Sequence, residues 1–256
     1  MRLQGIIFDM DGVIAETEAE GHRVAFNRAF AIMGLAIEWD HPTYKELLKI
    51  SGGKERIAYY LKTIAFNYPK GESEAEFLKR LHAKKTTVFM EMAEEGQMPA
   101  LPGVKRFIDE IIESGVKLAV ATSASEKACH ALLRSSLGNV LYEKIDAILA
   151  GDIVKKKKPD PEIYIIVQKK LRVDPKYSFV IEDSRNGLLS AIAEGFNVCI
   201  VPSLYTKGED FSEAQIVVDC LGEKPDFPAK LLQGDCLLEN DEVTLSVLES
   251  LLSISL

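Results

Sequence analysis

Short apolar runs that alternate with amphipathic helical patterns are the feature that most limits how this chain can fold. The apolar runs lie at residues 5–8, 116–122, 147–150, 178–182 and 197–201, with a further short one at 216–218. Nearly all-apolar strands are typical of parallel sheets that are buried on both faces. Between them, apolar residues recur at helical spacing, for example Val104, Phe107, Ile108 and Ile111. We therefore expect an α/β fold with a Rossmann-like, doubly wound parallel sheet.

The connection between the first and second predicted strands is too long for a simple crossover. It spans about 100 residues, whereas connections in such folds are mostly short. Helical patterns fill it at residues 45–62 and 74–94, and Phe26, Ala29, Phe30 and Met33 form one more apolar face. We expect residues 16–94 to form a helical cap domain inserted into a catalytic core of residues 1–15 and 95–256. Because the cap leaves and rejoins the core near the first strand end, we expect it to close over whatever binds there.

Two aspartates, Asp9 and Asp11, follow the first predicted strand directly. Strand side chains alternate with period two, and Gly12 can bend the chain, so both carboxylates can converge on one small volume. Carboxylates that close repel one another unless a cation lies between them, and Mg²⁺ prefers oxygen ligands while keeping places for phosphate oxygens. Taken alone, the Asp-Met-Asp-Gly sequence also fits an ordinary turn. A calcium loop fits poorly, because Val13 and Ile14 stand where it needs an oxygen ligand and a glycine.

Polar residues also follow the next three predicted strands. They are Thr122 and Ser123 after the second strand, Lys158 after the third, and Glu182 and Asp183 after the fourth. Each has a plain structural alternative: the hydroxyls and acids can cap helices, with Ser123 and Glu126 as a capping box, and Lys158 ends a run of four lysines that is solvated in many proteins. Ligands of open α/β sheets bind at the carboxyl ends of the strands. The coincidence of all these residues at successive strand ends therefore predicts a site for phosphate and a metal ion.

Charge and cysteine content narrow the class of partner. The 256 residues carry a formal net charge of −8, which argues against nucleic acid or an anionic membrane surface as the partner. No apolar run approaches the roughly 18 residues of a membrane span. The four cysteines show no Cys-x-x-Cys spacing, which predicts free thiols in a reducing compartment. We expect a soluble, intracellular and monomeric protein that binds a small anionic molecule.

The motifs together resemble those of the haloacid dehalogenase superfamily, over roughly residues 3–205. In order, they are Asp9-Met10-Asp11-Gly12-Val13, Thr122, Lys158-Pro159-Asp160-Pro161 and Glu182-Asp183-Ser184. The resemblance implies a Rossmann-like core with an inserted cap. It also implies that Asp9 attacks phosphorus to form an aspartyl phosphate, while Asp11 protonates the leaving group and then activates water. Mg²⁺ would be held by Asp9, the backbone carbonyl of Asp11 and Asp183, with Glu182 nearby, and Thr122 and Lys158 would hold phosphoryl oxygens.

The residue at position 11 separates activities within that superfamily. By resemblance, an aspartate there is typical of phosphatases and phosphomutases, whereas the ion-pumping ATPases carry threonine and the dehalogenases lack this acid. A sugar phosphomutase similar to β-phosphoglucomutase uses the same motifs and stays open as an alternative. A phosphoacceptor signalling module, which also uses an Asp, Thr and Lys set, is an alternative of another class, although such modules are much shorter than this chain.

Polar and cationic residues of the predicted cap are candidates for substrate binding, and their plain alternative is a solvated helical surface. They are Glu18, His22, Gly52, Gly53, Lys54, Glu55, Arg56, His82 and Lys85, to which Thr122 and Ser123 of the core are added. Residues 15–18, 52–56 and 150–152 are similar to the CbbY type of phosphatase from photosynthetic organisms. Members of that group dephosphorylate inhibitory sugar bisphosphates, chiefly xylulose-1,5-bisphosphate.

That similarity implies a substrate and a setting. Glu18 would bind sugar hydroxyls, and Lys54, Arg56 and Lys85 would hold the second phosphate of a pentulose bisphosphate. The protein would serve the Calvin cycle, in the cytoplasm of a bacterium or the chloroplast stroma of a photosynthetic eukaryote. Compared with the bacterial pattern, one residue is added between Glu18 and His22, and a longer tail follows Leu221.

Overall fold

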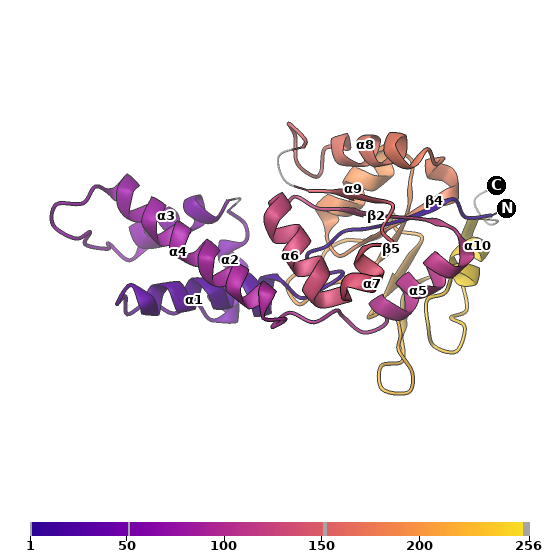
Figure 1. The fold of residues 1–256 in the computed structure, drawn as a ribbon, viewed down its shortest axis with the longest axis horizontal. Coiled ribbons are helices and arrows are strands. Elements are labelled where there is room, and N and C mark those ends of the chain that lie inside the picture. The colour runs from indigo at the N-terminus through magenta and orange to yellow at the C-terminus, as the bar shows by residue number, and fades with distance from the viewer. Residues whose placement is uncertain (1, 51, 151–152, 253–256) are drawn as a thin grey trace. The chain divides into compact units, whose positions relative to one another are not determined.

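The computed structural model describes residues 2–50, 52–150 and 153–252 of the chain. They form two units, each with its own packing (Figure 1). The core unit combines Met1–Glu16 with Met98–Leu256, and the helical unit is Thr17–Gln97. The chain therefore leaves the core unit just after the first strand and rejoins it before the second.

A seven-stranded sheet runs through the core unit, in the order β3-β2-β1-β4-β5-β6-β7. Its strands are β1 Gly5–Phe8, β2 Lys117–Ala121, β3 Ala147–Leu149, β4 Ser178–Glu182, β5 Asn197–Ile200, β6 Ile216–Val218 and β7 Leu231–Gly234. The first six are parallel, and each coincides with a predicted apolar run. β7 pairs antiparallel with β6 and was not predicted, because all four of its residues are exposed and show no alternation. The expected α/β fold with a largely parallel sheet is confirmed.

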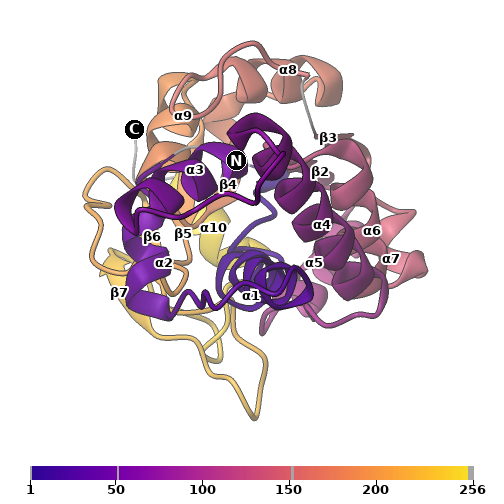
Figure 2. The same ribbon diagram turned by 90° about the vertical axis from the view of Figure 1, so that its left-hand side faces the viewer.

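Helices cover both faces of this sheet. They are α5 Val104–Ser114, α6 Glu126–Leu137, α7 Asn139–Tyr142, α8 Glu162–Leu171, α9 Arg185–Ala193 and α10 Leu245–Leu252, with a short 3₁₀ turn at Pro175–Tyr177. α8 and α9 lie over one face, and α5 and α7 lie over the other (Figures 1 and 2). On the first face, Tyr164, Val167 and Leu188 pack on strand residues such as Ile7 and Val180, all of them buried. The six parallel strands are thus largely buried on both sides, as their apolar residues require.

The start of α6 corrects one local prediction. Ser125, not Ser123, precedes the helix, and its side chain makes no capping hydrogen bond. The predicted capping box of Ser123 and Glu126 is therefore wrong. The backbone N–H of Ala124 instead donates to the Thr122 hydroxyl at 3.0 Å. The turn after β2 thus holds Thr122 in place and starts the helix two residues later than predicted.

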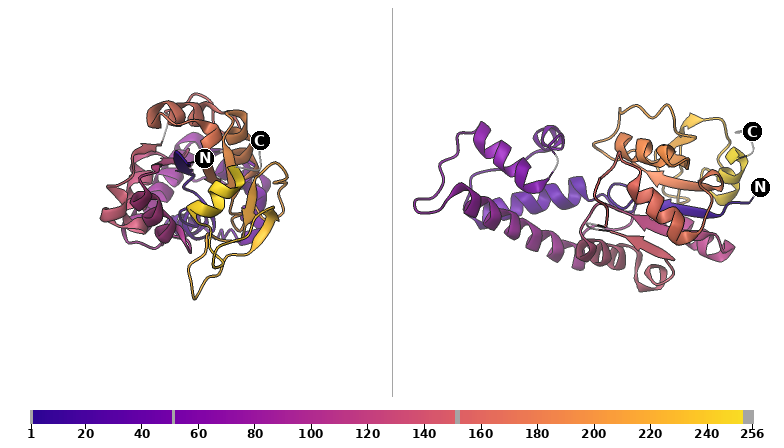
Figure 3. Two further views of the ribbon diagram at one scale, coloured as in Figure 1. Left: turned by 90° about the vertical axis from the view of Figure 1, so that its right-hand side faces the viewer. Right: turned by 90° about the horizontal axis from the view of Figure 1, so that it is seen from above.

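The helical unit is built from a π-helix and four α-helices. These are η1 Glu18–His22, α1 Arg23–Ile32, α2 His41–Leu47, α3 Gly53–Thr63 and α4 Glu74–Glu94. The long α4 runs alongside α1 (Figure 3). Aromatic rings fill the interior, with Trp39 4.7 Å from Phe26 and 4.9 Å from Phe30 between ring centroids. Among the described helices of both units, none is long and apolar enough to cross a membrane.

A π-helical turn, Glu18–His22, lies where the sequence comparison predicts one added residue. The backbone N–H of His22 donates to Thr17 O at 2.6 Å, a bond from residue i+5 to residue i. A π-turn holds more residues than an α-turn and occurs mostly as a single turn, often at functional sites. Such a turn can hold one additional residue, and α1 continues directly from it at Arg23.

Candidate active site

The ends of β1 and β4 bring three acidic side chains together. These strands are neighbours, with Phe8 opposite Ile181, so the residues that follow them lie side by side. Carboxylate oxygens of Asp9, Glu182 and Asp183 all lie within 4.8 Å of one another, and all three residues are buried. Of the two predicted acidic pairs, this cluster thus contains Asp9 from the first and both members of the second.

The electrostatics of the cluster fit a bound cation. Burial raises the pKa of Asp9 to about 8, even though Lys158 opposes the shift. Burial, followed by the charge of Glu182, likewise raises the pKa of Asp183 well above its usual value. A divalent ion would favour the ionised carboxylates, and a donor set made only of oxygens suits a hard cation. The residues present therefore fit a metal ion such as Mg²⁺.

Lys158 supplies the cluster with a positive charge. Its Nζ donates to Asp9 Oδ1 and to Glu182 Oε1, at 2.6 Å each, and to the carbonyl of Ala121 at 3.2 Å. Burial lowers the pKa of Lys158, but the carboxylates of Asp9 and Glu182 outweigh it and raise the pKa well above the usual value. The ammonium is therefore charged. Lys155, Lys156 and Lys157 are exposed, so the solvated reading of the lysine run holds for them and fails for Lys158.

Glu182 is the most fully bonded residue of the cluster. Besides Lys158, its Oε1 accepts a hydrogen bond from the Tyr164 hydroxyl at 2.9 Å. Its Oε2 accepts from the backbone N–H of Asp183 at 3.1 Å and from the Ser184 hydroxyl at 3.3 Å. Tyr164 was not predicted as a site residue, since an aromatic residue at helical spacing indicates only a core position. Five donors, counting the Ser184 N–H at 3.4 Å, thus hold this carboxylate.

Glycines let the chain approach the cluster closely. A Cβ added to Gly187 of α9 would lie 1.9 Å from the carboxyl carbon of Glu182. A Cβ added to Gly12 would lie 2.5 Å from an Asp183 oxygen, and the φ of Gly12 is +79°, which favours glycine in any case. The acidic side chains therefore occupy space that only glycine leaves free.

Asp11 is held by Thr122. The Thr122 hydroxyl donates to Asp11 Oδ2 at 3.0 Å, and Thr122 is buried while Asp11 is partly exposed. The ends of β1 and β2 are therefore connected by side chains at the point where sequence reasoning placed phosphate binding. Ser123 is exposed beside them.

The helical unit gathers cations in a chain that is otherwise acidic. Lys85 is buried, its Nζ lies 2.7 Å from His22 Nδ1, and it sits over the rings of Phe26 and Phe89 at 4.9 and 5.0 Å. Burial lowers the pKa of His22 well below its usual value, and the charges of Lys85, Arg56 and His82 add to the shift.

The second histidine of this group behaves in the same way. Burial and the charges of Lys85 and Lys54 lower the pKa of His82. Lys54, Arg56 and Lys85 thus disfavour a further positive charge on one or both of these histidines, and a bound anion would offset that effect.

A second set of predicted cap residues is joined by a tyrosine. The Tyr44 hydroxyl donates to Glu18 Oε2 at 2.6 Å and accepts from Arg56 Nη1 at 2.9 Å. Arg56 is buried, and its Nε also donates to the carbonyl of Leu47 at 3.0 Å. Sequence reasoning missed Tyr44, which lies just before the predicted helical pattern at residues 45–62.

The loop before α3 packs tightly as well. A Cβ on Gly52 would meet the Glu55 carboxylate at 2.2 Å, and one on Gly53 would meet His82 Nε2 at 2.8 Å. Gly52 and Gly53 therefore let Glu55 and His82 approach the backbone here. Gly151 and Asp152, part of the predicted motif at 150–152, lie outside the described residues.

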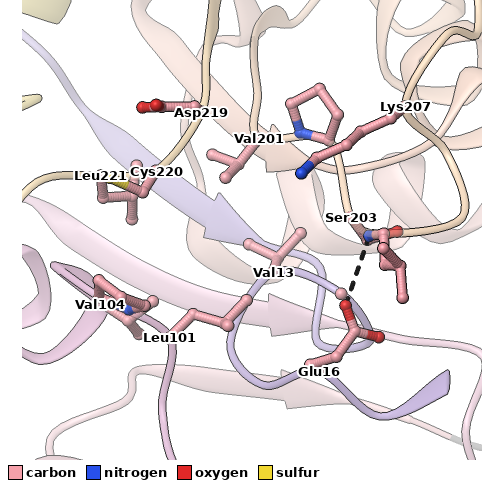
Figure 4. A pocket seen from close by; sticks show the side chains of 14 residues that line it. Val13, Glu16, Leu101, Val104, Val201, Ser203, Lys207, Asp219, Cys220 and Leu221 are labelled. Carbon is pink, nitrogen blue, oxygen red and sulfur yellow. Dashed lines mark hydrogen bonds between the residues drawn. The ribbon is translucent and has the colours of Figure 1, made fainter. Parts of the chain in front are cut away.

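A hollow of about 260 Å³ lies beside the acidic cluster in the core unit (Figure 4). Apolar side chains of Val13, Leu101 and Val201 line it, and the Leu204 N–H donates to Glu16 at 3.5 Å at its edge. It shares Gly12 and Ser203 with the loops next to the cluster. None of the three clustered acids lines it, so the candidate active site is defined by the side-chain geometry and not by this hollow.

The four cysteines, Cys129, Cys199, Cys220 and Cys236, are free thiols in the part of the chain that the structure describes, as predicted. Burial raises the pKa of Cys129 to about 12. A thiol with so high a pKa is a poor nucleophile at neutral pH. The candidate chemistry therefore rests on the carboxylates.

Known proteins are similar to this chain in both sequence and fold. A family model described as haloacid dehalogenase-like hydrolase matches residues 3–195. A CBBY-like protein of Arabidopsis thaliana is 44% identical over 224 residues, which cover 86% of this chain and 70% of that protein. The crystal structure of a mutant CbbY from Rhodobacter sphaeroides in complex with xylulose-1,5-bisphosphate is 38% identical with a TM-score of 0.72, covering 85% of this chain and 94% of that one.

A more distant relative carries a different activity in its name. The crystal structure of a β-phosphoglucomutase from Clostridium difficile is 25% identical with a TM-score of 0.65, covering 88% of this chain and 94% of that one. The predicted resemblance is confirmed by the family match and by the identity to the CBBY-like protein. This chain therefore belongs to the haloacid dehalogenase-like hydrolases and is closely related to the CbbY proteins.

Proposed function

We propose that this protein is a Mg²⁺-dependent phosphatase that hydrolyses a small sugar phosphate through an aspartyl-phosphate intermediate. The observation that carries the proposal is the buried grouping of Asp9, Glu182 and Asp183 around the Lys158 ammonium. Such a grouping offers an oxygen nucleophile, a fixed cation and ligands for a metal ion in one place.

Asp9 is the proposed nucleophile and Asp11 the proposed general acid and base. An oxygen of Asp9 attacks phosphorus, the P–O bond to the sugar breaks, and the carboxyl group of Asp11 gives its proton to the leaving sugar oxygen. Asp11 then takes a proton from water, whose oxygen attacks the aspartyl phosphate and releases inorganic phosphate and free Asp9. The partly exposed Asp11, anchored by Thr122, suits a group that exchanges a proton with substrate and water.

Thr122 and Lys158 are the proposed partners of the phosphoryl oxygens. Lys158 lies 2.6 Å from Asp9, so its charge is already at the reacting group before substrate arrives. Mg²⁺, held by Asp9, Asp183 and the backbone carbonyl of Asp11, would offset the negative charge of the carboxylates and the phosphate. Glu182 contributes by fixing Lys158.

A pentulose bisphosphate, such as xylulose-1,5-bisphosphate, is the proposed substrate. A bisphosphate needs a second set of cations, and the helical unit has them in Lys54, Arg56 and Lys85. Glu18, fixed by Tyr44, is the proposed acceptor for sugar hydroxyls. The CbbY structure with xylulose-1,5-bisphosphate supports this assignment. In a photosynthetic eukaryote the activity would belong to the Calvin cycle in the chloroplast stroma.

Phosphate release from a panel of sugar mono- and bisphosphates, with Mg²⁺ and with a chelator, tests the proposal. We expect hydrolysis only with the metal, and the highest kcat/KM for pentulose bisphosphates. Asp9→Asn should abolish turnover, whereas Asp226→Asn, which removes an exposed carboxylate of the core unit, should leave it unchanged. Full turnover in Asp9→Asn would refute the catalytic assignment, and a preference for monophosphates would refute the role of the helical unit.

The two alternatives predict different products. A phosphomutase would convert β-glucose 1-phosphate to glucose 6-phosphate, as the similarity to β-phosphoglucomutase allows. A signalling module would form a stable phosphoprotein without turnover. We expect inorganic phosphate to be the product and the phosphoprotein to be short-lived, because Asp11 can activate water.

A further inference from the structure

A buried tyrosine of α8 contacts both charged residues at the base of the candidate active site. The Tyr164 hydroxyl donates to Glu182 Oε1 at 2.9 Å, and Lys158 Nζ lies 5.1 Å from the centre of the Tyr164 ring. Tyr164 is fully buried, and burial raises its pKa well above the usual value. The phenol therefore reaches the carboxylate with its hydroxyl while its ring lies beside the lysine.

Tyr164 completes the set of bonds that fixes Glu182. One oxygen of Glu182 is held by the turn that follows β4, through the Asp183 N–H and the Ser184 hydroxyl. The other oxygen is shared by Tyr164 and Lys158. Without the phenol, only Lys158 would bind that oxygen, and less would oppose a turn of the carboxylate about its Cγ–Cδ bond.

The orientation of Glu182 determines where the lysine charge lies. Lys158 Nζ bridges Glu182 Oε1 and Asp9 Oδ1 at 2.6 Å to each, so its position depends on both carboxylates. When substrate binds, Asp9 becomes the attacking group, and Glu182 is then the charged anchor that remains, together with the Ala121 carbonyl at 3.2 Å. A rotation of Glu182 would carry the ammonium away from the phosphoryl oxygens.

We propose that Tyr164 is a positioning residue, whose hydroxyl orients Glu182 so that Lys158 stays against Asp9. This inference rests on the phosphatase function proposed above and adds a residue to it. Tyr164 touches neither metal nor substrate in this scheme, so its loss acts on the chemical step. Losing a hydrogen bond to a charged group lowers the rate about ten- to hundredfold when its whole free energy stabilises the transition state.

Steady-state kinetics of Tyr164→Phe with Mg²⁺ and the best sugar phosphate of the wild-type protein test the proposal. Phenylalanine keeps the buried ring beneath Lys158 and removes only the hydroxyl. We expect kcat to fall about ten- to hundredfold, with little change in KM or in the unfolding midpoint. Tyr142→Phe is the matched control, since it removes a hydroxyl bonded to His130 at 2.8 Å outside the cluster, and it should leave kcat unchanged.

A double-mutant cycle shows whether Tyr164 acts through Glu182. In a Glu182→Gln background, Tyr164→Phe should cause little further loss, because the carboxylate that the phenol orients is already gone. Independent, multiplying effects would overturn the proposal, as would wild-type kcat in Tyr164→Phe. A loss of kcat that is matched by a loss of the folded state would also overturn it in favour of a purely structural role.

Binding of beryllium fluoride, which mimics an aspartyl phosphate on Asp9, gives a readout that needs no turnover. With Mg²⁺ present, titration followed by ¹⁹F NMR should show at least tenfold weaker binding to Tyr164→Phe than to wild type or Tyr142→Phe. Equal binding would overturn the positioning role. If the wild-type protein bound beryllium fluoride but hydrolysed no sugar phosphate, the proposed substrate would fail while the role of Tyr164 would still be decided by the comparison.

Discussion

Replacing Gly187 by alanine gives two physical effects of opposite sign. Gly187 lies in the first turn of α9 with an ordinary helical backbone, so helix propensity alone favours alanine by up to about 1 kcal/mol. However, the new Cβ would lie 1.9 Å from the Glu182 carboxyl carbon and 2.0 Å from both of its oxygens. Side-chain contacts this short cannot persist, and overpacking in a dense interior costs about 1–3 kcal/mol.

The overpacking should prevail, because Glu182 has no free space to enter. Its two oxygens are held by Tyr164, Lys158 and the turn at Asp183, so any displacement breaks hydrogen bonds to a buried charge. We expect Gly187→Ala to lower the free energy of unfolding by about 1–2 kcal/mol. Because the displacement also moves Lys158, kcat should fall at least tenfold.

Urea denaturation of four proteins separates the two effects. The set is wild type, Gly187→Ala, Glu182→Ala and the double variant. If the Glu182 side chain is the obstacle, alanine at 187 should be neutral or stabilising once that side chain is removed, which gives a coupling energy of about 2 kcal/mol. An equal destabilisation in both backgrounds would show that the backbone of α9, and not the carboxylate, rejects the methyl group, and would refute the reasoning.

Three further predictions concern the acid, the metal and the helical unit. Asp11→Asn removes the proposed proton donor, so kcat should fall about 10²- to 10⁴-fold while the unfolding midpoint stays unchanged, and a smaller loss would exclude Asp11 as the acid. Without metal, the pKa of Asp9 is 3.8 in the unfolded chain and is raised to about 8 in the folded protein. The proton on Asp9 therefore stabilises the fold fully below about pH 4, and this contribution is lost as the pH rises through 8. Urea unfolding with a chelator should show the free energy of unfolding falling over this pH range, and falling less in Asp9→Asn. If η1 holds the predicted added residue, deleting the exposed Glu20 should let the helical unit keep its thermal midpoint and the enzyme most of its turnover. Unfolding of the unit would contradict that prediction.

Sequence patterns predicted the sheet well because buried parallel strands need nearly continuous apolar residues. The six parallel strands satisfy that condition, and the residues that follow them could be placed at one edge of the sheet from the topology alone. β7 lacks such a signal, because Leu231, Leu232, Gln233 and Gly234 are all exposed on an edge strand. Its pairing depends on β6, which a local pattern cannot show.

The hydrogen-bond partners of individual side chains in the site could not be predicted from the sequence. Tyr164 and Tyr44 are aromatic residues on helices, and both are buried in the structure. What spacing cannot show is which carboxylate each hydroxyl meets, since Glu182 and Glu18 come from distant parts of the chain. The same holds for Lys158, which differs from its exposed neighbours in the lysine run only through the fold.

Burying these charges costs free energy, which explains why so many groups donate hydrogen bonds to the Glu182 carboxylate. Three buried acids share one lysine, so each folded molecule without metal either keeps a proton on an acid or contains unbalanced charge. Five donors to Glu182 lower this cost but leave Asp9 and Asp183 with raised pKa values. A metal ion that binds only the folded state would add stability as RT ln(1 + [M]/Kd), about 2.7 kcal/mol at a hundredfold excess over Kd. In the proposed mechanism, the crowding of buried carboxylates that favours a metal ion also surrounds the nucleophile Asp9, so any change that relaxes the cluster should weaken metal binding and catalysis together.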